Sequence, residues 1–316
     1  MKKVVITGGL GYLGGRLSSK LLDTGMEVRA LSRRNPPASL LGTDTARSTV
    51  VCDYSSSSLE TAFSGCDTVV HLAAMNEIEC KSDPYKAIEF NVAGTQRVID
   101  AAMKTGIENL VFLSTAHVYG APLLGKITES KLPHPVHPYA TTHRAAEDLV
   151  YAAGVSGKIH TSIIRMSNSF GPPLNPEVNR WTLVCNDLCR QLIEKRQIIL
   201  NTSGIQVRDF ITLTDAVNAI KFIGENSESY ESGAIFNLGG KLSMSVRAIA
   251  EDISKIYEGK MGESIPVQAP EPKPGETAGY LDFDIGKLEA LGYSLGGKYY
   301  QELSELIDFC GAHFAK

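Results

Sequence analysis

Residues 4–14 read Val-Val-Ile-Thr-Gly-Gly-Leu-Gly-Tyr-Leu-Gly, and this stretch decides the fold. The apolar residues predict a buried strand, and the glycines that follow are spaced as Gly-x-x-Gly-x-x-Gly. Glycines between a strand and a helix let the backbone approach a pyrophosphate, whose charge then faces the positive end of the helix. A plain tight turn can share the pattern, but the strand–turn–helix context favours a dinucleotide phosphate site. We expect this site to be lined by Gly8, Gly11, Tyr12, Leu13 and Gly14.

Outward from this turn, short apolar runs alternate with amphipathic stretches of helix length. Strands are predicted at residues 4–7, 28–31, 50–52, 68–72, 110–113 and 160–165, and longer helices at 83–106 and 139–153. Buried strands separated by helices are typical of a parallel, doubly wound sheet. The sequence therefore predicts an α/β protein with a Rossmann-type sheet.

The rhythm changes after residue 166, where a proline- and glycine-rich cluster occupies residues 171–176. Further segments predict a helix at 180–195, strands at 198–200, 206–211 and 234–238, and helices at 214–224 and 245–257. We expect a dinucleotide-binding domain over residues 1–166, with 206–238 returning to it. Residues 167–205 and 239–316 would form a smaller, mixed C-terminal substrate lobe.

Composition narrows the classes of partner. The 316 residues carry 31 Lys and Arg against 35 Asp and Glu, a formal charge of −4, which argues against binding to nucleic acid or an anionic membrane. No apolar run is long enough to cross a membrane, and the first one is too short for an export signal. The six cysteines contain no C-x-x-C pair, which argues against a zinc ribbon or dithiol site. We expect a cytoplasmic protein with free thiols and no metal.

More motifs follow the glycine turn in a fixed order. They are Asp53 after the third strand, His71-Leu72-Ala73-Ala74 after the fourth, Asn91-Val92-Ala93-Gly94-Thr95, Ser114-Thr115 through Gly120, Pro138-Tyr139, Arg165 through Pro172, and Gln206-Val207-Arg208-Asp209-Phe210-Ile211. This series resembles the extended short-chain dehydrogenase/reductase family of NAD(P)-dependent sugar-nucleotide epimerases, dehydratases and reductases. The resemblance covers nearly the whole chain.

The resemblance implies a set of cofactor contacts. Asp53 would hold the adenine amino group with Tyr54 beside it, and the backbone of Leu72, Ala73 and Ala74 would run along the cofactor. The further cofactor contacts that it implies are Asn91, Ser114 and His143.

The end of the second strand bears on the choice between NAD and NADP. Ser32 stands where relatives that prefer NAD carry Asp, and Arg33 and Arg34 follow it. An arginine accommodates the 2′-phosphate of NADP through a charge-assisted fork. We therefore favour NADP, with NAD as the alternative if the two arginines form only a solvated loop.

By the same resemblance, Tyr139 is the catalytic acid/base and Thr115 hydrogen-bonds the reacting oxygen. The family pattern is Tyr-x-x-x-Lys, but here the fourth residue after Tyr139 is His143. An imidazole, with an unperturbed pKa of ~6.5, carries the positive charge only part of the time at neutral pH. Three interpretations stay open: a dinucleotide binder without catalysis, His143 in a positioning role with Arg144 or oxidised nicotinamide supplying charge, or a reductase that depends less on an acidic phenol.

Two features favour reduction of a ketone. The first is that His143 replaces the Lys, since a reductase depends less on an acidic phenol. The second is the Ser32-Arg33 ending of the second strand, which favours NADP. The Asp-Glu pair that dehydratases of the family carry after the Thr reads Ala116-His117 here, which argues against 4,6-dehydration. The sequence thus favours a 4-keto sugar-nucleotide reductase with Tyr139 as proton donor. The alternatives are an NAD-dependent 4-epimerase or dehydratase, and a regulatory dinucleotide-binding protein.

The substrate side is implied by the resemblance alone. Asn168 and Arg208 would contact the nucleotide sugar, and Lys273-Pro274-Gly275-Glu276 stands for the family motif Arg-Pro-Gly-Asp, so Lys273 and Glu276 are further candidates. His117 is either a proton-transfer group at the substrate or structural, and Arg208 either binds diphosphate or pairs with Asp209. Trp181 would line the pocket or anchor the core. The family also implies a homodimer formed through residues 83–104 and 139–153.

Overall fold

The computed structural model describes residues 1–315 and is built around a parallel sheet of seven strands in the order β11-β7-β5-β4-β1-β2-β3. The strands are β1 (Lys3–Thr7), β2 (Glu27–Ser32), β3 (Thr49–Val51), β4 (Thr68–His71), β5 (Asn109–Thr115), β7 (His160–Met166) and β11 (Ala234–Leu238). Every pairing in this sheet is parallel. The predicted α/β Rossmann-type fold is confirmed.

Helices cover both faces of the sheet because its strands are apolar on both sides. Val4 and Ile6 pack with α1 (Tyr12–Asp23) and α9 (Leu213–Glu225), whereas Val5 packs with the helices on the opposite face. Those helices are α3 (Ser56–Phe63), α6 (Gly94–Thr105) and α7 (Pro138–Val155). Short helical segments complete this part of the chain: η1 (Ala38–Leu40), α2 (Asp44–Arg47), α4 (Glu77–Ser82), α5 (Pro84–Ala87), η2 (Ile88–Ala93), η3 (Ala116–Tyr119) and η4 (Ser227–Ser229).

The order of the strands fixes the position of the site. The order of the strands changes direction at β1, because β2 and β3 lie on one side of it and β4, β5, β7 and β11 on the other. In open parallel sheets a crevice forms at such a point, outside the carboxyl ends of the strands. The segments after β1, β4 and β5 leave the sheet at this edge.

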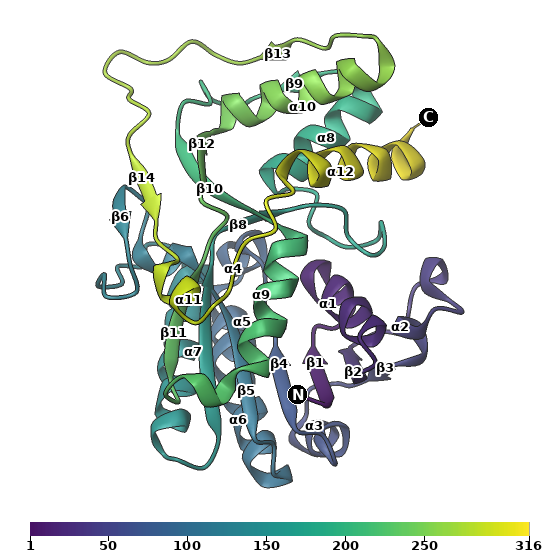
Figure 1. Ribbon diagram of the computed structural model, residues 1–316, viewed down its shortest axis with the longest axis vertical. Helices are drawn as coiled ribbons and strands as arrows, with labels where there is room; N and C mark the ends of the chain where they lie inside the picture. Colours follow the sequence, from purple (N-terminus) through teal and green to yellow (C-terminus); the bar gives the residue numbers. More distant parts are fainter. Residues whose placement is uncertain (316) are drawn as a thin grey trace.

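A smaller lobe covers this edge and lies at the top of Figure 1. Its three-stranded sheet has the order β12-β10-β8, with β8 (Asn168–Phe170), β10 (Val207–Thr212) and β12 (Leu242–Ser245). Its core joins α8 (Val184–Lys195), α10 (Val246–Met261) and α12 (Tyr299–Phe314). Two short strand pairs, β9 (Ile198–Ile199) with β13 (Val267–Gln268) and β6 (Gly125–Ile127) with β14 (Leu281–Phe283), and α11 (Gly286–Ala290) complete the fold.

Three elements differ from the sequence expectation. The helix expected at 83–106 contains the π-helical turn η2 between α5 and α6, and the helix expected at 180–195 begins only at Val184. The strand expected at 206–211 forms β10, which joins the lobe sheet, while β11 joins the large one. The proposed domain ranges stay a prediction. Over residues 1–315 no helix is both long and apolar enough to cross a membrane.

Candidate active site

The glycine turn between β1 and α1 has the shape that a pyrophosphate requires. Gly11 caps α1 without a side-chain hydrogen bond, so the N–H groups of the first helical turn have no side-chain partner at the cap. A Cβ on Gly14 would lie 2.1 Å from the Gly8 carbonyl oxygen, and Gly8 has a φ of +69°. Only glycine fits both positions, and the free donors at the helix N-terminus fit an anionic group. The turn therefore fits the pyrophosphate of a dinucleotide.

The side chains of the two residues that start α1 point away from the turn. Leu13 packs into the core beneath the sheet. The Tyr12 hydroxyl donates a hydrogen bond to the Gly171 carbonyl at 3.0 Å and lies 3.2 Å from the amide oxygen of Asn186, in α8. What Tyr12 and Leu13 offer at the turn is thus their backbone N–H groups.

The ends of β2 and β3 bring the expected adenosine-side residues together. The Gly8 N–H donates to the Tyr54 hydroxyl at 2.9 Å, and the Tyr54 ring lies 6.1 Å from that of Phe90. Phe90 in turn carries the Arg33 guanidinium 5.0 Å above its ring. Arg33 therefore has a cation–π partner within the protein.

Two further residues lie at the same strand ends. Hydrogen bonds from Ser58 and Ser55 lower the pKa of Asp53 to about 2, so this exposed carboxylate is ionised. The Ser32 hydroxyl accepts the Arg34 N–H at 3.1 Å and caps its own turn.

The Leu72-Ala73-Ala74 segment runs beside the glycine turn. The Thr7 hydroxyl accepts the N–H groups of Leu72 and Ala73, each at 3.1 Å, and a Cβ on Gly8 would lie 3.2 Å from the Ala73 nitrogen. The ends of β1 and β4 are thus held in contact, and Ala74 follows directly.

Asn91 uses its side chain to hold this segment against α7. Its amide oxygen accepts the Met75 N–H at 2.8 Å, and its Nδ2 donates to the Thr142 hydroxyl at 3.0 Å. Because the side chain is buried and bonded on both sides, Asn91 fixes the segment after β4 relative to α7.

Ser114 and Thr115 end β5 and point in different directions. The Ser114 hydroxyl donates to Glu147 at 2.6 Å, inside the protein. The Thr115 hydroxyl accepts the His117 N–H at 3.2 Å and lies close enough to the Tyr139 phenol to lower its pKa. Of the two, Thr115 meets the candidate acid/base group.

Tyr139 begins α7 in a geometry set by its neighbours. His137 caps the helix through Nδ1, which accepts the Tyr139 N–H at 3.2 Å, and Pro138 occupies the first helical position. Burial raises the pKa of the Tyr139 phenol above its ordinary value, and the Glu77 carboxylate raises it further. The phenol is therefore protonated at neutral pH.

His143 lies one turn further along α7, between the rings of Tyr139 and Phe112. The ring centroids of Tyr139 and His143 are 4.2 Å apart, and Nδ1 of His143 is 2.8 Å from the Tyr139 carbonyl oxygen. Because a carbonyl only accepts, Nδ1 carries the proton. Burial lowers the pKa of His143 to about 4, so the ring is neutral where a lysine would be charged.

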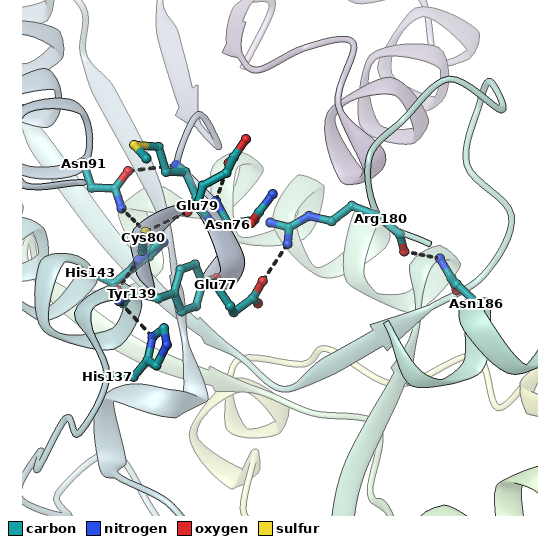
Figure 2. Close-up of polar contacts among 11 residues, drawn as sticks. Asn76, Glu77, Glu79, Cys80, Asn91, His137, Tyr139, His143, Arg180 and Asn186 are labelled. Atoms are coloured by element: carbon teal, nitrogen blue, oxygen red, sulfur yellow. Dashed lines mark hydrogen bonds and ion pairs between the residues drawn. The ribbon is translucent and has the colours of Figure 1, made fainter. Parts of the chain in front are cut away.

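A charge pair that the sequence pattern does not reveal lies beside the phenol, as Figure 2 shows. Glu77 is the first residue of α4, after the N-cap Asn76, and its carboxylate lies 2.9 Å from the guanidinium of Arg180. Asn76 and Glu79 form a reciprocal capping box, a pattern that is visible in the sequence. Arg180 was hidden because residues 180–183 were expected to be helical, whereas they form a turn.

The substrate candidates divide into two groups. His117 and Arg208 lie near each other: burial lowers the pKa of both, and the charge of Arg208 lowers that of His117 further. No acidic residue among residues 1–315 forms an ion pair with Arg208; Asp209 instead accepts hydrogen bonds from Ser167 at 2.6 Å and from Gly240 at 3.0 Å. The expected alternative of an Arg208–Asp209 pair is wrong.

The other candidates bond within the lobe. Asn168 donates from Nδ2 to the Asp209 carbonyl at 2.9 Å. Glu276 accepts the Lys273 N–H at 2.9 Å and the Ser203 hydroxyl at 2.6 Å, on an exposed loop between β13 and β14. Trp181 packs on Phe314 with a centroid distance of 4.8 Å, so it anchors the segment to α12.

Comparisons with known proteins agree with this geometry. The model of the NAD dependent epimerase/dehydratase family matches residues 4–239. A dTDP-D-glucose 4,6-dehydratase from Homo sapiens is 28% identical over 276 residues, which cover 83% of this chain and 76% of that protein.

Solved structures are similar over the whole chain. The UDP-N-acetylglucosamine 4-epimerase from Methanobrevibacter ruminantium M1, in complex with UDP-N-acetylmuramic acid, superposes with a TM-score of 0.82 at 22% identity and covers 98% of this chain and 97% of its own. MoeE5 in complex with UDP-glucuronic acid and NAD gives a TM-score of 0.78 at 25% identity, with 97% and 98% covered. The expected resemblance is confirmed, and the chain belongs to the NAD dependent epimerase/dehydratase family.

Proposed function

We propose that the chain is an NAD-dependent enzyme that epimerises a sugar carried on a nucleoside diphosphate, with Tyr139 as the acid/base group. The observation that carries the proposal is the position of the buried Tyr139 phenol, which lies close enough to Thr115 at the end of β5 for that hydroxyl to lower its pKa, on the sheet edge that also bears the glycine turn. Hydride transfer at a hydroxyl-bearing carbon needs a proton-transfer group beside a nicotinamide site. Bound NAD would take up and return the hydride.

Epimerisation is preferred to the reduction that the sequence favours. The names of the relatives, which are epimerases and dehydratases, support chemistry that begins with oxidation. Among these, epimerisation removes and returns a proton at one oxygen, for which Tyr139 suffices. Dehydration needs further acid and base groups, and the two residues after Thr115 are Ala116 and His117.

NAD is preferred to NADP. A similar solved structure, MoeE5, contains NAD, and the expected preference for NADP has no support from the relatives. Arg33, the residue that favoured NADP, packs over Phe90 and does not need a 2′-phosphate as its partner.

For the substrate we assign Arg208 to the diphosphate and His117 to the sugar. Support comes from the guanidinium of Arg208, which is partly buried, has no acidic partner among residues 1–315 and lies close enough to His117 to lower its pKa. A planar guanidinium binds phosphate oxygens through two parallel hydrogen bonds. The roles of Asn168, Lys273 and Glu276, the homodimer and the cytoplasmic location stay predictions.

The test is turnover of nucleotide sugars by the purified protein, with NAD and with NADP in parallel. UDP-glucose, UDP-glucuronic acid and dTDP-D-glucose are incubated separately, and products are read by mass and chromatography. We expect a product of unchanged mass that requires NAD. A product lighter by one water would indicate a dehydratase, and oxidation of NADPH by a 4-keto sugar nucleotide would indicate a reductase.

Tyr139→Phe tests the assigned group directly. The rate should fall by at least about a hundredfold, because a positioned acid/base group contributes that much or more. Tyr151→Phe, at an exposed position of the same helix, is the matched control and should keep the wild-type rate. A Tyr139→Phe variant as active as the wild type would sink the proposal.

A further inference from the structure

The Tyr139 phenol has no source of positive charge on its own helix. Two basic residues follow it on α7. His143 is neutral, as described above, and Arg144 bridges Glu147 at 3.3 Å and Asp148 at 2.6 Å. Both sources of charge that the sequence suggested on this helix are thus excluded by geometry or burial.

A fixed charge reaches the phenol from the lobe instead. Arg180 lies in the segment between β8 and α8, and its Nη1 is 2.9 Å from Oε2 of Glu77. Glu77 starts α4, which packs against α7, and Figure 2 shows its side chain next to the Tyr139 ring. The two charged side chains are 25% and 41% exposed, so water screens them only in part.

The two charges act on the phenol in opposite directions. After burial, Glu77 is the strongest influence and raises the pKa of Tyr139, whereas Arg180, the strongest cation, lowers it. The influence is mutual: burial works against the charge of Arg180, but Glu77 and Tyr139 together raise its pKa. Burial also opposes ionisation of Glu77, but Arg180 outweighs it and holds the pKa of the carboxyl below its usual range.

We propose that Arg180 is a positioning residue that supplies, from the lobe, the positive charge that α7 does not give to Tyr139, and that Glu77 holds its guanidinium there and offsets part of its effect. The proposal rests on the role of Tyr139 as the acid/base group. A guanidinium suits the task because it stays protonated at every working pH, which an imidazole does not.

The other titratable groups around the phenol do not supply this charge. On α4, burial raises the pKa of Cys80, so its thiol is uncharged. On η3, burial lowers the pKa of His117, so its ring loses the positive charge at a lower pH than an ordinary histidine does. Before α7, the N-cap His137 uses Nδ1 to accept the Tyr139 N–H, and on α7 itself His143 is neutral.

The direct test measures ionisation of the phenol without substrate. Tyr139 is replaced by 3,5-difluorotyrosine in the full chain, because its more acidic phenol titrates where the fold survives, and ¹⁹F NMR follows the titration. Arg180→Gln should raise the phenol pKa by about one unit, and Arg180→Lys should leave it near the starting value. Glu77→Gln should lower it by about one unit, because the amide removes the negative charge and still offers Arg180 an acceptor.

A matched control separates charge at the site from charge in general. Arg190→Gln removes another guanidinium of the lobe, one that is paired with Glu194 at 2.8 Å, and should leave the titration unchanged. Opposite shifts in Arg180→Gln and Glu77→Gln support the proposal. Shifts in the same direction would mean that the pair only seats the lobe, and no shift in either would mean that it does not reach the phenol; both results overturn the proposal.

Turnover then gives an independent readout. In a plot of kcat against pH, the acidic limb of Arg180→Gln should lie about one pH unit higher than that of the wild type. At pH values below this limb its kcat should be about tenfold lower. His143→Lys added to Arg180→Gln should restore the profile, because an ammonium on α7 replaces the missing charge. The ¹⁹F titration does not need turnover, so it can succeed even where the proposed sugar-nucleotide chemistry fails.

Discussion

At the scale of single residues, His143 shows how burial decides the role of a side chain. The sequence identifies the position because it falls four residues after Tyr139, but it cannot tell whether an imidazole there is charged. The neighbouring rings of Tyr139 and Phe112 remove water, and the Tyr139 carbonyl fixes the proton on Nδ1. The result is a neutral donor in place of a cation.

This burial makes stability depend on pH. The pKa of His143 is about 4 in the folded protein and 6.5 ordinarily, so between these values the unfolded chain binds the extra proton. The contribution is complete above pH 6.5 and is lost as pH falls towards 4, by about 3 kcal/mol in total. The free energy of unfolding of wild type and His143→Gln is measured in urea at pH 7.5 and pH 4.5. Between these pH values the wild type should lose more stability than the variant.

His134→Gln is the control for this measurement. His134 is exposed, so its replacement should leave the pH dependence unchanged. If wild type and His143→Gln lost stability in parallel, the imidazole would already be charged in the folded protein.

At the scale of elements, a buried ion pair joins β7 to α7 beneath the site. Arg165 meets Glu147 through two parallel hydrogen bonds of 3.0 and 2.7 Å, and the Ser114 hydroxyl of β5 donates to the same carboxylate. Both charged side chains are inaccessible to solvent, and the contact of Glu147 with Arg144, at 3.3 Å, is longer than its two bonds to Arg165, so each is the main charged partner of the other. This pair fixes α7, and with it Tyr139, relative to the end of β5.

Removing one partner of this pair should be costly. Arg165→Met leaves the Glu147 charge buried and should lower the free energy of unfolding by about 4 kcal/mol. The double variant Arg165→Met/Glu147→Leu should recover much of this loss, because no lone charge remains. As a control, the more exposed pair Arg190 and Glu194 treated in the same way should change stability by less than about 1 kcal/mol.

Denaturant unfolding of the four variants checks this expectation. A double variant as unstable as Arg165→Met would mean that lost packing, and not the unpaired carboxylate, accounts for the cost.

The sequence predicts the elements that local pattern specifies and misses those that tertiary contacts impose. The strands of the large sheet are continuous apolar runs, and the glycine turn carries its own conformational signature, so both were predictable. The turn at residues 180–183 was not, because it depends on the bond from the Trp181 indole to the Pro176 carbonyl and on stacking against α12. For the same reason Glu77 and Arg180, which come from segments 103 residues apart, had no joint signal in the sequence.

At the scale of the whole molecule, α1 joins the large sheet to the lobe. Arg16 donates to the Pro172 carbonyl and to the Thr214 hydroxyl, each at 2.8 Å, and lies 3.3 Å from the Glu302 carboxylate of α12. These contacts of Arg16, which we call the polar seam, join the large sheet with its helices to the lobe. We therefore expect the two to unfold together.

The single tryptophan allows a test of this cooperativity. Trp181 packs on α12, so its fluorescence reports on the lobe, whereas far-UV circular dichroism reports on all helices and strands. In urea the two signals should share one midpoint in the wild type. Arg16→Met should lower the fluorescence midpoint first, since it removes the polar contacts of the seam.

A wild-type fluorescence transition that finishes while the dichroism is still native would show that the lobe unfolds on its own.

The hydroxyl of Tyr12 gives the phosphate turn a mechanical link. Its peptide N–H lies in the first turn of α1, while its hydroxyl reaches Gly171 and Asn186 in the lobe. A tilt of α8 would therefore shift the first turn of α1 through the Tyr12 side chain. If the turn binds a dinucleotide as we propose, its binding and the position of α8 would be coupled through this one side chain.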